Sequence, residues 1–134
     1  MAASALALLA APARAEETGR LTTHVLDTAS GRPAGGMKID FYAKDGEGYR
    51  LVSSTQTNPD GRTDKPLLIG EAVKVGQYQI VFHVAEYYTK IGTKISDPPF
   101  LDTVPVQFSI FDAKAHYHVP LLTTPWSYST YRGS

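Results

Sequence analysis

The stretch that decides the fold reads His116-Tyr117-His118-Val119-Pro120-Leu121-Leu122, then Thr123-Thr124-Pro125, then an aromatic, hydroxyl-rich run at residues 126–130. Side chains alternate between the two faces of a β-strand, so the first run places both histidines on one face. The proline-containing segment that follows is typical of a turn. Together these residues predict a closing β-hairpin that presents two imidazoles on one face.

The same alternation predicts further short strands upstream, at residues 21–27, 37–44, 49–56, 67–69, 76–84 and 104–110. In the first of them, His24 shares a face with Thr22 and Leu26. Residues 85–91, which Gly92 stops, form the one predicted helix. Seven or eight short strands with one small helix predict an all-β, antiparallel β-sandwich.

The composition limits the classes of function. The chain has 134 residues, enough for one domain with a sizeable core, and its 13 basic and 13 acidic side chains give a formal net charge of zero. A neutral chain without a basic or acidic block is not typical of a nucleic-acid or anionic-membrane partner, so we expect neither. Because the chain has no cysteine, disulfides, thiolate catalysis and cysteine–zinc sites are excluded.

The first fifteen residues differ from the rest of the chain. Residues 1–15 are almost all Ala, Leu and Ser, and they end Ala13-Arg14-Ala15, which resembles the end of a secretory signal peptide. No basic residue precedes the apolar run, so a disordered leader is the alternative. We expect a folded domain over 16–134 and a periplasmic or secreted protein, with a cytoplasmic location as the alternative.

Few side chains are candidates for chemistry. The sequence has no G-x-S-x-G, H-E-x-x-H or glycine-rich phosphate motif. His83 falls in the strand predicted at 76–84 and is interpreted as structural. The pair His116 and His118 fits three readings: a polar strand face, a zinc site that needs a third ligand, or a histidine acid–base site. The spacing alone leaves these readings open.

Four stretches together resemble the transthyretin-like family, and specifically its 5-hydroxyisourate hydrolases. They are residues 21–27 with 31–34, residues 57–62, residues 116–122 and residues 128–134. The match spans residues 21–134. It implies an eight-stranded antiparallel transthyretin-like β-sandwich with one short helix. It also implies a homotetramer, a dimer of dimers, with active sites at the dimer–dimer interface.

The resemblance also implies a reaction and a set of residues. The reaction is hydrolysis of 5-hydroxyisourate, a small purine-derived product of urate oxidation, to 2-oxo-4-hydroxy-4-carboxy-5-ureidoimidazoline, without a metal or other cofactor. The implied catalytic residues are His24, Arg62 and His118, the implied substrate-binding residues are Tyr131, Arg132, Gly133 and Ser134, and His116 is implied as a supporting neighbour. In this scheme the two histidines activate water and the arginine stabilises the developing anion.

The carrier branch of the same family differs at the positions that matter. Carriers have lysine at the position of His24, glutamate at that of Arg62, and threonine at those of His118 and Tyr131, so these positions favour the hydrolase. Three alternatives remain: a small-molecule carrier on this fold, a zinc hydrolase that uses His24, His116 and His118, and a structural β-sandwich module.

Overall fold

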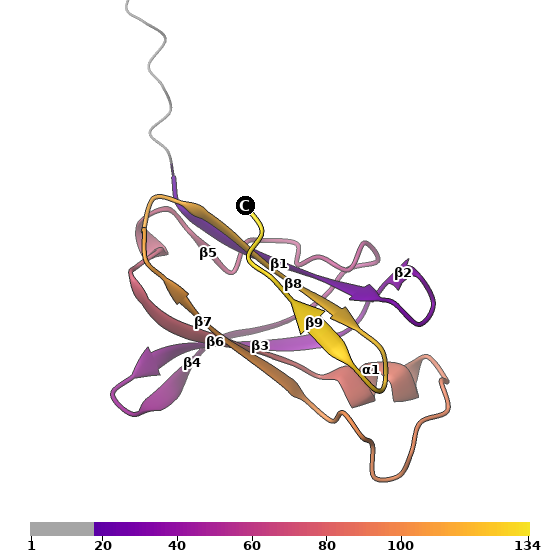
Figure 1. Cartoon of the computed structure of the whole chain (residues 1–134). Helices are drawn as coiled ribbons and strands as arrows, with labels where there is room; N and C mark the ends of the chain where they lie inside the picture. Colours follow the sequence, from indigo (N-terminus) through magenta and orange to yellow (C-terminus); the bar gives the residue numbers. More distant parts are fainter. Residues whose placement is uncertain (1–17) are drawn as a thin grey trace, which may run out of the picture.

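Two β-sheets pack face to face in this chain, with one short helix at the edge (Figure 1). The computed structural model describes residues 18–134, so the leader expected at 1–15 lies outside the described residues. The first sheet holds β1 (Arg20–Asp27), β2 (Arg32–Pro33), β5 (Leu68–Ile69), β8 (His116–Thr123) and β9 (Tyr128–Thr130). The second holds β3 (Lys38–Asp45), β4 (Gly48–Gln56), β6 (Gly76–Phe82) and β7 (Val104–Ile110). A 3-10 turn, η1 (Gly70–Ala72), and a helix, α1 (Val84–Lys90), complete the described elements.

The core forms where the inner faces of the two sheets meet. Leu21, Val25 and Leu121 of the first sheet, and Phe41 and Ile80 of the second, are all fully buried. Each side chain of this kind stabilises the fold by about 1.5–3 kcal/mol when it leaves water. The period-two patterns therefore identify the buried faces correctly, and the predicted all-β sandwich is confirmed.

One strand pairing corrects the antiparallel prediction. β1 and β8 run parallel, while every other strand pair in residues 18–134 is antiparallel. The described chain also has nine strands, because the short β2 adds to the eight expected. Alternation of side chains defines the faces of a strand but carries no information on the direction of its neighbour. The parallel register places Thr22 beside His118 and His24 beside Pro120.

The region of His83 also differs from its prediction. β6 ends at Phe82 and α1 begins at Val84, so residues 83 and 84 lie outside the strand predicted at 76–84. His83 Nε2 lies 2.7 Å from Asp40 Oδ2 on β3. Val84 is buried in the helix as it would be in a strand, which is why the apolar pattern did not mark the boundary. The contact with Asp40 agrees with the interpretation of His83 as a structural residue.

Buried Asp27 anchors the helix on the sheet. Its carboxylate accepts hydrogen bonds from the hydroxyl groups of Tyr87 at 3.2 Å and Tyr88 at 2.8 Å. Burial, followed by the charge of this carboxylate, raises the pKa of Tyr87 to about 12. Asp27 lies on the face of β1 opposite to His24, so this polar cluster belongs to the core. Nowhere in residues 18–134 is there a helix long and apolar enough to cross a membrane.

Candidate active site

The two histidines predicted to be catalytic meet on one face of the first sheet. His24 comes from β1 and His118 from β8, and His118 Nε2 lies 3.4 Å from His24 Nδ1. Their rings stack with centroids 5.6 Å apart and planes 22° apart. Both side chains are half-buried. The parallel pairing of β1 and β8 creates this contact, because it aligns the two strands residue by residue.

A tight turn brings Arg62 to the same place. Asn58 Oδ1 accepts hydrogen bonds from the backbone N–H groups of Asp60 at 2.9 Å and Arg62 at 3.2 Å. The Gly61 carbonyl accepts from the Val25 N–H at 2.8 Å, which docks the turn on β1. Gly61 has φ 76°, and a Cβ there would collide with the Val25 carbonyl oxygen. Only glycine fits this approach, which lets Arg62 form an isolated backbone bridge with His24.

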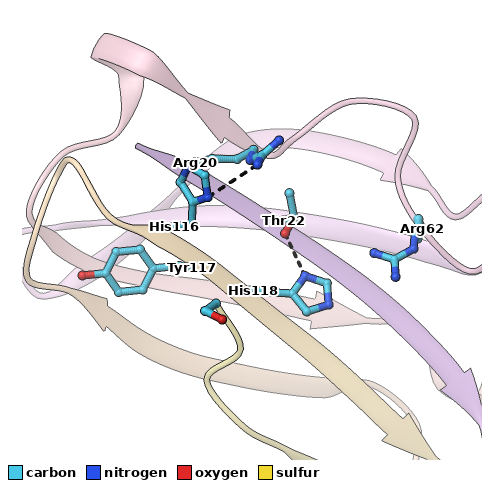
Figure 2. Close-up of a pocket in the computed structure, with 7 residues that line it drawn as sticks. Arg20, Thr22, Arg62, His116, Tyr117 and His118 are labelled. Atoms are coloured by element: carbon cyan, nitrogen blue, oxygen red, sulfur yellow. Dashed lines mark hydrogen bonds between the residues drawn. The ribbon is translucent and has the colours of Figure 1, made fainter. Parts of the chain in front are cut away.

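A pocket of about 340 Å³ opens over this face (Figure 2). Its lining consists of Arg20, Thr22, Arg62, His116, Tyr117, His118 and Ser134. These seven described residues include two arginines and no acidic side chain. His24 is not part of this lining, and its Nδ1 contacts His118 Nε2, which is. The pocket therefore combines imidazole nitrogens with positive charge, an arrangement that suits a polar, electron-rich ligand.

The segment after β9 folds back over His118. The backbones of His118 and Gly133 exchange two hydrogen bonds, at 3.2 and 2.7 Å. A Cβ at Gly133 would lie 3.1 Å from His118 Cβ and 3.2 Å from its Cδ2. These contacts are tighter than a side chain tolerates without a shift. Gly133 therefore allows the segment to lie against the imidazole and places Ser134 in the pocket lining.

The other two residues expected to bind substrate lie elsewhere in this chain. The Arg132 guanidinium sits over the Tyr117 ring at 4.6 Å and the Phe111 ring at 5.4 Å, and it donates to the His116 carbonyl at 3.4 Å. Arg132 therefore holds the segment after β9 against β8 but does not line the pocket. Tyr131 is 59% exposed and is also absent from the lining.

His116 also lines the pocket. Its Nε2 lies 3.0 Å from the Thr18 carbonyl, so that nitrogen carries the proton, and its Nδ1 then accepts from the Arg20 guanidinium at 3.5 Å. The zinc hypothesis needed this residue to converge with His24 and His118, which it does not. Within the described part of the chain, no group of three His, Asp or Glu side chains is arranged to hold a metal ion.

The surroundings of the histidine pair keep both rings neutral. Burial lowers the pKa of His24, and the nearby positive charge of Arg62 lowers it further. Burial also lowers the pKa of His118, with added contributions from His24 and Arg62. Protonation would place a second cation beside the guanidinium. Near pH 7 each imidazole therefore has a lone pair that can accept a proton.

Three residues of the pocket, Arg20, Thr22 and Tyr117, were not singled out from the sequence. Thr22 Oγ1 lies 2.7 Å from His118 Nδ1. The alternation did place Thr22 on the face of His24. Its partner on β8 depends on the parallel pairing, which no local pattern predicts.

Comparisons with known proteins agree with the fold. The model of the HIUase/Transthyretin family matches residues 21–133. The 5-hydroxyisourate hydrolase 2 of Rhizobium meliloti is 54% identical over 118 residues, which cover 88% of this chain and 98% of the relative. The 5-hydroxyisourate hydrolase of Pseudomonas aeruginosa is 50% identical over 126 residues, covering 94% of this chain and 100% of the relative.

Solved structures show the same fold under different functions. The crystal structure of (S)-allantoin synthase superposes with a TM-score of 0.83 at 48% identity, over 89% of this chain, and the chain spans only 45% of that protein. Sea bream transthyretin in complex with thyroxine superposes with a TM-score of 0.75 at 26% identity, over 85% of this chain and 94% of that one. The fold alone therefore does not decide whether a protein is an enzyme or a small-molecule carrier.

Proposed function

The chain belongs to the HIUase/transthyretin family, and on that basis we propose that it is a 5-hydroxyisourate hydrolase. One observation carries the proposal: two imidazoles lie within 3.4 Å of each other, beside a guanidinium and next to a polar pocket. A carrier of an apolar aromatic ligand needs a matching apolar surface and has no use for a proton acceptor. Curated relatives with at least 50% identity carry the hydrolase name, which supports the same reading.

The reaction opens the six-membered ring of 5-hydroxyisourate at a C–N bond. The oxygen of water bonds to the ring carbonyl carbon, and the C–N bond then breaks. The new carboxylic acid ionises and releases one proton of the water to solvent, and the leaving nitrogen needs the other. A neutral imidazole of the His24–His118 pair takes the proton from water and returns it to that nitrogen. The product is 2-oxo-4-hydroxy-4-carboxy-5-ureidoimidazoline.

Arg62 acts on the negative charge that develops at the attacked carbonyl. Its guanidinium is always charged and presents N–H groups in a planar fork that matches two oxygen acceptors. The turn docked on β1 fixes its backbone beside His24. Such pre-positioned donors stabilise the transition state more than the ground state, which is what accelerates the chemical step.

The assembly and location proposed for the enzyme follow the family and the leader. β7 and β9 are edge strands of their sheets, so each has a free edge that suits pairing with a second copy. We propose a homotetramer, a dimer of dimers, in which the pocket is completed between subunits. Export to the periplasm rests on residues 1–15 alone.

The function is tested by the loss of substrate in real time. Urate oxidase generates 5-hydroxyisourate in situ from urate, and its absorbance is followed with and without this protein. We expect the absorbance to decay faster in proportion to the amount of protein added. A decay rate equal to that of the protein-free control would overturn the proposal.

Activity is expected to depend on pH through the histidine pair. Only neutral imidazole accepts a proton, and burial with Arg62 lowers the pKa of both rings below the ordinary 6.5. The neutral forms therefore persist below pH 6.5, and kcat/KM should fall only at lower pH, with its midpoint on the acid side of 6.5. A profile that stays flat to pH 4.5, or one with a midpoint above 6.5, would contradict a histidine base in this setting.

Gly133 is expected to be required for activity because it lies against His118. In the Gly133→Ala variant the new Cβ meets His118 Cβ at 3.1 Å, so the segment or the ring must move. A misplaced catalytic group costs up to about 10²-fold in rate, and we expect at least a tenfold loss of kcat. Gly48→Ala is the matched control, since a Cβ there meets nothing within 4 Å. Equal activities of the two variants would show that the segment does not hold the imidazole in place.

A further inference from the structure

Both ring nitrogens of His118 have partners. Nδ1 lies 2.7 Å from Thr22 Oγ1, and Nε2 lies 3.4 Å from His24 Nδ1. Figure 2 shows the first of these contacts among the residues that line the pocket, with the threonine hydroxyl directed at the imidazole. The three side chains thus form a chain in the order Thr22, His118, His24.

The protons of this chain can be arranged in two ways. In the first, the hydroxyl donates to His118 Nδ1, so His118 Nε2–H donates to His24 Nδ1, and His24 carries its own proton on Nε2. In the second, His118 Nδ1–H donates to the hydroxyl oxygen, His24 Nδ1–H donates to His118 Nε2, and His24 Nε2 keeps a lone pair. Only a hydroxyl satisfies His118 in both arrangements, because it both donates and accepts.

The second arrangement is the one that can take a proton from water at His24 Nε2. The resulting imidazolium is stabilised because its Nδ1–H already points at His118, whose ring is in turn held by the threonine oxygen. When the proton passes to the leaving nitrogen, the chain returns to its starting state. The three side chains gain and lose no proton over the cycle, and the proton of the new carboxylic acid passes to solvent.

We propose that Thr22 is a positioning residue of the hydrolase site: its hydroxyl orients the His118 ring and sustains the tautomer that leaves His24 Nε2 free to accept a proton. The inference rests on the proposed function and deepens it, since it assigns the proton transfer to His24 and the support to His118. Of the two contacts of the His118 ring, the one to the Thr22 hydroxyl is the shorter, at 2.7 Å against 3.4 Å. This hydrogen bond fixes the His118 ring and so aligns it with His24.

Thr23 provides a matched comparison within the same pair of strands. Its hydroxyl also bonds to β8, donating to the Val119 carbonyl at 2.7 Å, but on the opposite, buried face of the sheet. Removal of either hydroxyl costs one hydrogen bond between β1 and β8. Only removal of the Thr22 hydroxyl leaves an imidazole nitrogen of the pocket without its partner.

The test compares Thr22→Val, Thr22→Ser and Thr23→Val with the wild-type chain. We expect Thr22→Val to lower kcat about tenfold or more while KM changes less than threefold, because an unpaired Nδ1 lets the ring turn and change tautomer. Thr22→Ser should restore most of the activity. Thr23→Val should keep the wild-type kcat per folded molecule, although its melting temperature falls.

A second readout does not depend on turnover. Nitrogen-15 NMR of the histidine rings reports which nitrogen of His118 carries the proton, and we expect the Nδ1–H form to be populated in the wild type and in Thr22→Ser, and to be depleted in Thr22→Val. Wild-type kcat and the wild-type tautomer in Thr22→Val would overturn the proposal. An inactive wild-type chain with the expected tautomers would instead refute the proposed function while leaving the positioning role of Thr22 supported.

Discussion

Replacement of His118 with asparagine is expected to lower kcat about 10²-fold or more, which is the contribution of a general acid–base pair. Asparagine keeps a polar group of similar size, but it accepts no proton at neutral pH. It also cannot bridge Thr22 and His24, which contact the two ring nitrogens of His118. The rate of 5-hydroxyisourate decay, measured at saturating substrate, gives the effect directly.

His83→Asn is the control for this variant. His83 is also half-buried and hydrogen-bonded, but its partner is Asp40 on the other sheet. We expect this variant to keep its kcat within threefold of the wild type. A loss of less than threefold in His118→Asn would contradict a role for His118 in supporting the proton transfer.

Arg62→Gln is expected to reduce kcat by about 10²–10³-fold, the range measured when one donor to a developing oxyanion is removed. Loss of the positive charge also removes a cause of the lowered pKa of both histidines. The acid midpoint of the pH profile should therefore move upward. Arg62→Lys should recover only part of the activity, because lysine keeps the charge but lacks the planar fork.

Arg50→Gln serves as the matched control for the loss of an arginine. Arg50 is exposed on β4, in the sheet that does not carry the pocket. Its replacement should change neither kcat nor the acid midpoint. An Arg62→Gln variant whose acid midpoint falls, or whose kcat stays within threefold of the wild type, would contradict the assigned role.

The faces of the strands were predictable from the sequence because burial follows a period of two. His24 and Thr22 share one face of β1, and Val25 is buried on the other, as alternation requires. The partner of β1 was not predictable, because β8 lies more than 90 residues away and a strand pattern has no direction. The contact between the two histidines follows from that pairing.

The segment after β9 shows a second limit of prediction. The family pattern groups residues 131–134 as one motif that binds substrate. In the structure Ser134 lines the pocket and Gly133 packs on His118, whereas Arg132 stacks on Tyr117. A motif of adjacent residues does not show which of them line the pocket and which pack against the rest of the chain. The packing of Arg132 depends on the Tyr117 ring, which lies on a different strand.

The most direct test of the account is the rate of 5-hydroxyisourate decay with the double variant His118→Asn/Arg62→Gln beside the wild-type chain. Both proteins are used at equal concentration, after circular dichroism shows the same β-sheet content and cooperative melting. We expect the wild type to accelerate the decay and the double variant to leave it at the spontaneous rate. A double variant that keeps more than about a tenth of the wild-type rate would contradict it, since such a loss is far below that expected for either group alone.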